Sequence, residues 1–345
     1  MSNLHIGLAI AGGLVLAGVV AHGAWTTRRN APRQALPDAA GGALDADKEP
    51  KLNHDDIDTV PFGLPTIARR PVMDTLIDVI ASIALESPGA IVSGEAALAA
   101  LPATRRAGTK PFAVEGYNLA ALVWELPVAG QRYGAFQAGV QLANRSGALN
   151  EIEYSEFVVK TQAFADAING TPEFPEMLDE VARARELDNF ASAHDAQLGF
   201  TIRALHASWS PGYIQQNAGR LGFVAGVIPG RMVLPASSEG LPAVLVLSFD
   251  SQAALAEDPA QSAIRDVVLH LDVAQVDRSE NAFERMREAA SALAQAMDGV
   301  VTDDLGQPLA AQSMDQISAD LQSLYDTLEQ RDLAAGSTLA RRLFS

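Results

Sequence analysis

The sequence predicts an α+β protein: one N-terminal transmembrane helix, a linker, and then an antiparallel sheet with helices on one face, in two degenerate copies. Three observations lead to this fold class. Residues 6–25 are apolar or small almost throughout, and a proline-rich, acidic segment follows to residue 71. Two later passages then repeat the order strand, short serine-capped helix, strands, longer helix. The expected divisions are an anchor (1–27), a flexible linker (28–71), a first α+β unit (72–196), a second α+β unit (197–331) and a tail (332–345).

The apolar run from Ile6 to Trp25 has the length of a transmembrane helix, because twenty residues at helical rise span about 30 Å. No Lys or Arg precedes it, whereas Arg28, Arg29 and Arg33 follow. Positive residues stay on the cytoplasmic side, so the N-terminus is expected outside and the rest of the chain inside. The alternatives are a secretory signal peptide, whose positive charge would precede the run, and a buried core helix, for which so long an apolar run is unusual.

Small residues recur at every fourth position of this run and could let two such helices pack closely: Ala9, Gly13, Ala17 and Ala21. Gly and Ala are so common in the segment that chance also accounts for the stripe. The partners expected for the anchor are therefore the lipid bilayer, through residues 6–25, and a weak homodimer.

Charge and cysteine content exclude several classes of function. The 345 residues carry a formal net charge of −17. Three arginines and no acid lie in the first 35 residues, which leaves 22 basic against 42 acidic side chains, a net of −20, for the rest. Such a body is repelled by nucleic-acid phosphate and by anionic lipid headgroups. The absence of cysteine excludes disulfides, thiolate metal sites and cysteine nucleophiles, and it suits a reducing cytoplasm.

Residues 30–71 are rich in proline, alanine, glycine and aspartate and show no apolar period, which predicts a flexible linker. A coil of this length would reach roughly 35 Å. Asp55, Asp56 and Asp58 form an acidic cluster that could be interpreted as a metal site, but it lacks the ligand spacing of a calcium loop. A run of solvated charges is the favoured interpretation.

Apolar periodicity and cap residues predict the elements of both units. In the first unit we expect a strand at 77–85, a helix from the Ser93 cap to Pro102, apolar segments at 112–117, 119–126 and 136–143, and helices at 152–168 and 175–195. In the second unit we expect strands at 200–205, within 223–234, at 244–249, 266–276 and 299–304, and helices at 210–221, at 281–297 and from a Ser313–Gln316 capping box to Leu328. Residues 198–205 could close the first unit or open the second. No element is predicted for the tail.

The sequence offers no motif for catalysis, metal binding or cofactor binding. It contains no glycine-rich phosphate loop, no His-Glu-x-x-His and no Gly-x-Ser-x-Gly. The six histidines lack the spacing of metal ligands: His5, His22, His54, His194, His206 and His270. Asp303 and Asp304 could form an acid–base pair, but a turn is the favoured interpretation. We therefore expect a protein that is not an enzyme and holds no metal or cofactor.

Two stretches resemble the ZipA family of membrane-anchored cell-division proteins. The apolar run ends in His22-Gly23-Ala24-Trp25 and then Thr26-Thr27-Arg28-Arg29, which resembles the family's exit from the membrane. The predicted helix 281–297 leads into Gly299-Val300-Val301-Thr302-Asp303-Asp304, a turn and a last helix, which resembles the end of the family's FtsZ-binding domain. The resemblance covers residues 1–29 and 198–331.

The resemblance implies a single-pass protein of the bacterial inner membrane at the division site, with a periplasmic N-terminus and cytoplasmic domains. It implies that the second unit binds the C-terminal tail of FtsZ in a shallow apolar groove on its exposed sheet face and tethers FtsZ filaments to the membrane. Carried over strand by strand, the groove positions would be Phe200, Ile202, Met232, Ser248, Val268 and His270. Each could instead be a core residue, since a register slip of one would exchange the two faces.

The chain departs from the family in its short linker, in its strongly acidic body and in its first unit, which has no counterpart in the family's short form. The rival interpretations are a membrane-anchored peptide-binding protein of the same fold with a different cytoplasmic partner, and an enzyme with a polar pocket that the sequence does not indicate. In both peptide-binding interpretations, apolar contacts in the groove would have to supply the affinity.

Overall fold

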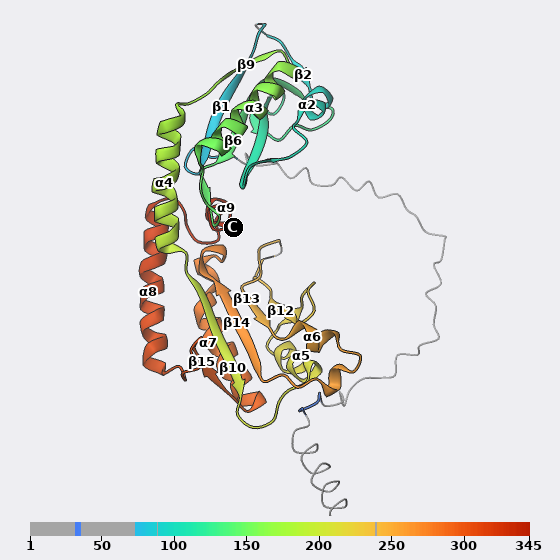
Figure 1. Ribbon diagram of the computed structural model, residues 1–345, viewed down its shortest axis with the longest axis vertical. Coiled ribbons are helices and arrows are strands. Elements are labelled where there is room, and N and C mark those ends of the chain that lie inside the picture. Colours follow the sequence, from blue (N-terminus) through green and yellow to red (C-terminus); the bar gives the residue numbers. More distant parts are fainter. Residues whose placement is uncertain (1–31, 36–72, 88, 239) are drawn as a thin grey trace, which may run out of the picture. The chain divides into compact units, whose positions relative to one another are not determined.

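The computed structural model describes residues 32–35, 73–87, 89–238 and 240–345, and the chain divides into two compact units (Figure 1). The first unit comprises Ala43–Asp195 and Ser337–Ser345, and the second unit comprises Met1–Gly42 and Ala196–Gly336. Both units are α+β with antiparallel strand pairing, which confirms the coarse fold class.

The first unit has a seven-stranded sheet with β3-β4-β6-β1-β9 as its main path. Its strands are β1 (Asp78–Leu85), β2 (Val92–Ser93), β3 (Arg106–Ala107), β4 (Lys110–Asn118), β5 (Val123–Glu125), β6 (Arg132–Gln141) and β9 (Gly170–Glu173), with a separate hairpin of β7 (Ala143–Asn144) and β8 (Gly147–Ala148). Its helices are α2 (Gly94–Ala100), α3 (Glu151–Ala167), α4 (Met177–His194) and α9 (Thr338–Leu343).

The second unit has a six-stranded sheet in the order β11-β12-β13-β14-β10-β15. Its strands are β10 (Gln197–Ala204), β11 (Val224–Ala225), β12 (Arg231–Leu234), β13 (Leu245–Ser248), β14 (Asp266–Asp272) and β15 (Gly299–Thr302). Its helices are α5 (Pro211–Gly219), α6 (Ser251–Leu255), α7 (Ala282–Met297) and α8 (Ala311–Gln330), with 3₁₀ turns η1 (Pro259–Gln261), η2 (Val273–Gln275) and η3 (Arg278–Glu280).

The two sheets share one topology. When the strands of β3-β4-β6-β1-β9 are numbered by their order in the chain, the spatial order is 2-3-4-1-5, and the path β12-β13-β14-β10-β15 gives the same order. The helices correspond as well: α2 and α5 follow the first strand, α3 and α7 precede the last strand, and α4 and α8 follow it. Every strand pair along both paths is antiparallel.

Aromatic side chains pack one helix against one face of each sheet. In the first unit the rings of Phe136 (β6) and Phe164 (α3) lie 5.3 Å apart in an edge-to-face arrangement. In the second unit Phe200 (β10) and Phe283 (α7) also meet edge to face, at 6.1 Å, although on a different strand of the shared topology. Because side chains alternate along a strand, these contacts fix which residues of each strand enter the core and which point to the opposite face.

The local cap signals explain most helix starts. Ser93 and Ser210 cap α2 and α5 as predicted: each hydroxyl accepts a backbone N–H of the first turn, and Pro211 occupies the first helical position of α5. The prediction of a capping box at Ser313 and Gln316 is wrong. Helix α8 begins two residues earlier, at Ala311, and no side chain caps it.

The C-terminal segment, for which the sequence predicts no element, forms helix α9 in the first unit. Arg342 donates through both terminal nitrogens to Asp78, at 2.9 and 2.5 Å, and its carbonyl accepts from Gln141 Nε2. The Asp78 side chain is 2% exposed. Residues 332–345 are therefore not a simple tail.

Arg33 also departs from the flexible linker predicted for residues 28–71. It forms a parallel β-bridge with Trp209: its N–H donates to Ser208 O at 2.7 Å, and its carbonyl accepts from Ser210 N at 2.9 Å. In the part of the chain that the structure describes, no helix has the length and apolarity needed to span a bilayer, and the predicted span lies outside that part.

Arg342→Ala should strongly destabilise the first unit, by about 3–5 kcal/mol, because it leaves a buried carboxylate unpaired. Burial raises the pKa of Asp78 and Arg342 opposes that rise, so removing Arg342 raises this pKa further. The lost stability should then return as the pH falls below the ordinary aspartate range, where Asp78 is neutral in both folded and unfolded chains, and should be lost as the pH rises. Urea unfolding at neutral and acidic pH measures both effects.

The matched control is Arg145→Ala, which removes a bidentate but more exposed ion pair with Asp195 in the same unit. That change should cost about 1 kcal/mol or less. Equal losses in the two variants would contradict a special role for the buried pair.

Candidate functional site

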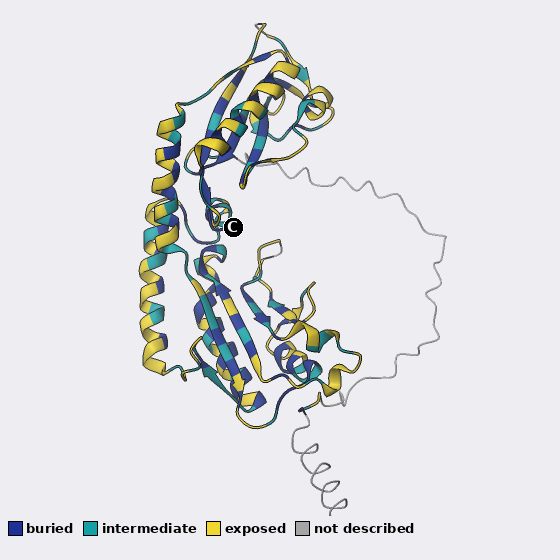
Figure 2. Ribbon diagram, viewed as in Figure 1, coloured by how far each residue is buried: buried dark blue, intermediate teal, exposed yellow. Residues whose placement is uncertain are grey.

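The face of the second sheet opposite α7 carries a row of exposed and half-buried side chains. On β14 these are Asp266, Val268, His270 and Asp272, which alternate with the buried Val267, Leu269 and Leu271. Figure 2 shows the same alternation on β14 and the neighbouring β10. Strand register extends the face sideways, because Thr201 and Ser248 flank Val268, and Gly199 and Val246 flank His270.

One end of this face is hollowed. A depression of about 360 Å³ is lined by Val246 and Ser248 of β13, His270 and Asp272 of β14, and Arg231 of β12. It combines apolar strand side chains with a few polar groups, a composition typical of peptide and small-ligand sites. An extended chain could lie along it in contact with alternate side chains of three strands.

Gly199 of β10 lies on the same face, next to the hollow. It lies directly beside His270 across the β10–β14 ladder, and a Cβ atom built on it would meet only Asp304 Oδ1, at 3.5 Å. The backbone conformation at Gly199 does not itself require glycine, because its φ is not in the left-handed region. The glycine therefore leaves open space on the face where any other residue would place a side chain.

His270 has the most specific environment on the face. Its Nε2 lies 3.0 Å from Ser248 Oγ. Partial burial lowers the pKa of the imidazole, Arg231 lowers it further, and Asp304 opposes them. Burial and Arg231 thus favour the neutral imidazole, which can exchange a hydrogen bond with a neutral partner.

The structure divides the six predicted groove residues by strand face. Ser248, Val268 and His270 lie on the open face. Phe200, Ile202 and Met232 do not: they are 3%, 0% and 4% exposed, on the side of the sheet that α7 covers. Their assignment to the groove is corrected to the hydrophobic core, and the cause is the one-residue change of strand face.

Three residues of the open face escaped the sequence prediction: Gly199, Val246 and Arg231. The alternation of Val244–Phe249 in the sequence predicts a strand but not which parity faces the helix. A glycine inside the strand pattern 197–204 was a usable signal, because an interior glycine often marks a close approach of another group.

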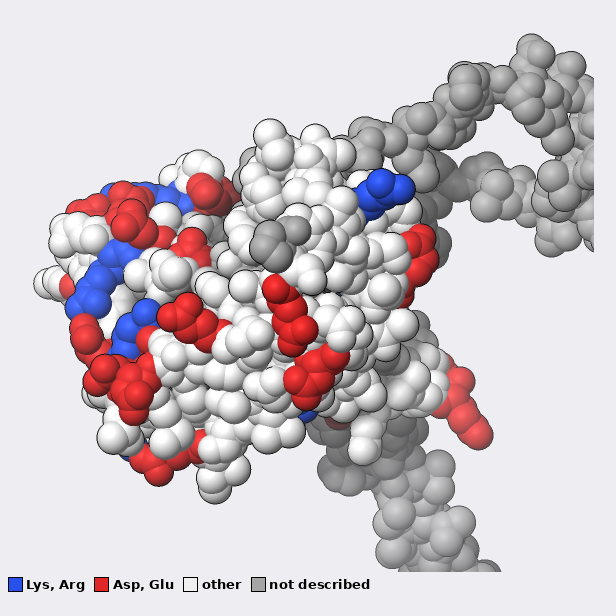
Figure 3. Space-filling model, turned by 90° about the horizontal axis from the view of Figure 1, so that it is seen from above, with Lys and Arg blue, Asp and Glu red and all other residues white. Residues whose placement is uncertain are grey.

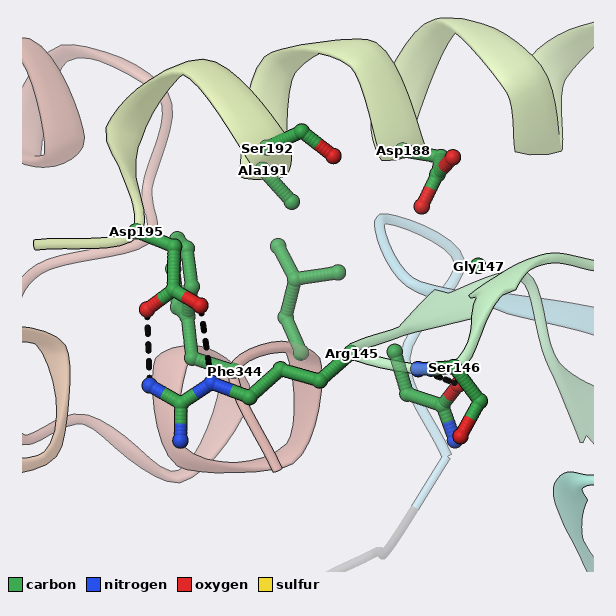
Figure 4. A pocket seen from close by; sticks show the side chains of 10 residues that line it. Arg145, Ser146, Gly147, Asp188, Ala191, Ser192, Asp195 and Phe344 are labelled. Carbon is green, nitrogen blue, oxygen red and sulfur yellow. Dashed lines mark hydrogen bonds and ion pairs between the residues drawn. The ribbon is translucent and has the colours of Figure 1, made fainter.

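A second hollow lies wholly within the first unit (Figure 4). Its volume is about 470 Å³, and it is lined by the β7–β8 hairpin, α4 and the C-terminal residues Leu343 and Phe344. Arg145 and Asp195 pair across it through two hydrogen bonds of 2.8 and 2.7 Å, and Arg145 N donates to Ser345 O. These contacts bind the C-terminal segment to the hairpin and to the end of α4, which indicates a structural role.

The family model described as "ZipA, C-terminal FtsZ-binding domain" matches residues 248–320. The match supports assignment of the chain to the ZipA family. No curated protein matches the chain.

The matched region begins at the end of β13 and runs through β14, α7 and β15 into α8. It therefore includes Ser248, Val268 and His270, whereas the three predicted groove residues found in the core precede it. The ZipA match thus covers the central strand β14 and the edge strand β15 of this face, but not β10, which lies between them. Among the described residues, no cluster of histidines and carboxylates suits a metal ion.

The imidazole of His270 should titrate with a pKa below the ordinary histidine value, and Arg231→Ala should raise that pKa because it removes a nearby positive charge. Asp304→Asn should lower it. NMR titration of the histidine side-chain resonances measures all three. An unshifted His270 in Arg231→Ala would contradict the electrostatic coupling.

Proposed function

We propose that this protein is a membrane-anchored cell-division adaptor that binds the C-terminal tail of FtsZ on the open sheet face of its second unit and tethers FtsZ filaments to the inner membrane. One observation carries the proposal: the region that matches the ZipA FtsZ-binding domain contains the exposed side chains of β14, on the sheet face opposite α7. The alternative is a protein of the same fold with another cytoplasmic peptide partner.

The geometry of the face supports binding of an extended apolar peptide. Val246 and Val268 supply apolar contact, Gly199 leaves room for a side chain of the peptide, and His270 with Ser248 supplies hydrogen-bonding groups. Arg231 adds one positive charge at the rim. Burial of a few apolar side chains gives modest affinity, and many tethers along one filament convert modest affinity into firm attachment.

Surface charge favours such a local apolar site over a broad electrostatic one. Figure 3 shows acidic side chains spread over the visible surface, with fewer basic side chains, and much of the remainder carries neither. Together with the net charge of −17, this pattern disfavours nucleic acid as a partner.

The contacts that Arg33 makes with the second unit limit the length of chain between this unit and the proposed membrane anchor. Arg33 Nη2 pairs with Asp298 at 2.8 Å, and Arg33 Nη1 donates to Met297 O at 3.3 Å, in addition to the two backbone bonds that flank Trp209. If residues 6–25 form the anchor, eight peptide steps join Trp25 to this docked residue, which is at most about 28 Å. The second unit would then stay close to the membrane, independently of residues 36–72.

Gly199→Leu should weaken binding of an FtsZ C-terminal tail peptide by at least tenfold, because the new side chain fills the hollow beside His270. Fluorescence anisotropy with the full chain in detergent measures the affinity. The control is Gly219→Leu, at the end of α5, where a Cβ would meet no atom within 4 Å. Unchanged tail binding in Gly199→Leu would overturn the assignment of the face, and no binding by the wild-type chain would favour the alternative partner.

Phe200→Ala should act through stability instead, because Phe200 is a core residue. The expected cost is about 3–5 kcal/mol in the free energy of unfolding. Denaturant unfolding, combined with tail-peptide titration of the folded fraction, separates stability from affinity. The affinity per folded molecule should be nearly unchanged. A loss of affinity in a fully folded variant would show that Phe200 contacts the peptide.

Arg33→Glu should release the docked segment, because the new carboxylate faces Asp298. The amides of Arg33 and Ser210, which are hydrogen-bonded across the bridge, should then exchange with solvent much faster. Hydrogen–deuterium exchange with peptide-level mass spectrometry reports both. Gln34→Glu is the neighbouring control, since Gln34 makes only a long exposed contact of 3.5 Å to Ala260 O. Equal protection in Arg33→Glu and the wild type would show that the segment does not depend on this ion pair.

A further inference from the structure

The shared topology allows the open face of the second unit to be located on the first. Strands β9 and β15 both begin with glycine: Gly170 pairs with Leu85 of β1, and Gly299 pairs with Ala204 of β10. Leu85 of β1 and Ala204 of β10 therefore occupy matched positions. Counting five residues towards the N-terminus from each, Ile80 of β1 corresponds to Gly199 of β10.

The partners of these two residues correspond in the same way. Ile80 pairs with Gly139 of β6 and Gly199 pairs with His270 of β14, so Gly139 occupies the position of His270. On the next strand Ala113 occupies the position of Val246.

In the first unit the chain's own Met73 covers Gly139, the residue that corresponds to His270. A Cβ atom on Gly139 would collide with Met73 Sδ, and its next contacts would be Met73 Cγ at 3.0 Å and Val79 O at 3.3 Å. Met73 is only 8% exposed, although it precedes the first strand of the unit. Its thioether therefore lies over Gly139 on the sheet face opposite α3.

Two carboxylates hold the backbone of the same segment. Met73 N donates to Glu115 Oε1 at 3.2 Å, and Asp74 N donates to Asp78 Oδ2 at 2.8 Å. Glu115 occupies the position of Ser248, and it also accepts from Gln137 Nε2 at 2.7 Å. Asp78 is fixed in turn by Arg342 of α9. Met73 therefore enters a site over Gly139 while a backbone N–H of its segment is held by a strand carboxylate, which resembles the way a sheet face takes one side chain of a docked peptide.

We propose that the face of the first sheet opposite α3 is a peptide-docking face, and that the chain's own segment at Met73 occupies it in cis. The corresponding face of the second unit is thereby the one open to a partner. The glycine at the His270 position accommodates the methionine, whose unbranched thioether adapts to a shallow site. The assignment of the occupant does not depend on FtsZ; the expectation of one FtsZ tail per chain does rest on the function proposed above.

The first test is oxidation of the full-length chain by hydrogen peroxide, followed residue by residue with mass spectrometry. Met73 should form sulfoxide at least tenfold more slowly than the half-buried Met177 of α4. Gly139→Ala should abolish this protection, because its methyl group takes the place of the thioether. The matched control on the same strand is Gly134→Ala, whose methyl group would meet the exposed Leu119 instead.

Docking and ordinary core packing give different results. If Met73 is docked, Gly139→Ala exposes it while the unfolding midpoint of the first unit moves no more than in Gly134→Ala. If Met73 becomes oxidised only in proportion to global unfolding, it is a core residue and the proposal fails. Oxidation of Met73 as fast as Met177 in the wild-type chain would also overturn it.

The second test adds the Met73 segment as a separate synthetic peptide. A synthetic peptide of residues 67–76 should bind saturably to the full-length Met73→Ser variant and not to the wild-type chain, whose site is filled. The same peptide with serine in place of methionine should bind neither. Failure of the methionine peptide to bind a folded Met73→Ser variant contradicts the proposal, whatever the outcome of the FtsZ-tail titration.

Discussion

The alternation of side chains along an antiparallel strand, anchored by one helix on one face, is the constraint on which the functional surface depends. In the second unit the contact between Phe200 and Phe283 places Phe200, Ile202 and Ala204 of β10 in the core, and the residues between them face the other side. The hydrogen-bonded register between neighbouring strands then determines which residues of β14 and β13 face the core. A shift of one residue at any strand would exchange the apolar core with the proposed binding surface, so the register determines both stability and the composition of that surface.

The same constraint acts in both units with different outcomes. In the second unit the face opposite α7 presents Gly199, Val268 and His270, and a hollow remains beside them. In the first unit the corresponding positions hold Ile80, Gln137 and Gly139, and Met73 fills the space above the glycine. One topology thus yields a face with a hollow in the second unit and a face covered by Met73 in the first unit.

Segments outside the two sheets are held by specific polar contacts. Arg33 docks on the second unit beside Trp209, whose indole Nε1 donates to Met297 O at 2.7 Å. The chain returns to the first unit at its C-terminal end, where Arg342 reaches the buried Asp78. Buried ion pairs contribute specificity of position, because breaking one leaves an uncompensated charge in a poorly solvated site. In a chain with so strong an acidic excess, an arginine at such a site also relieves local repulsion.

The sequence by itself determined the α+β class, most helices and strands, the serine caps of α2 and α5 and the resemblance to the ZipA family, because periodicity, cap residues and local order are properties of short stretches. Of the six groove positions that the resemblance suggested, three lie on the open face: Ser248, Val268 and His270. Only the tertiary structure decided that Phe200, Ile202 and Met232 are core, because the parity of a strand relative to a helix is set by contacts between residues far apart in the chain. For the same reason the partners of Arg33, Met73 and Arg342 could not be derived from spacing: each lies dozens to hundreds of residues away.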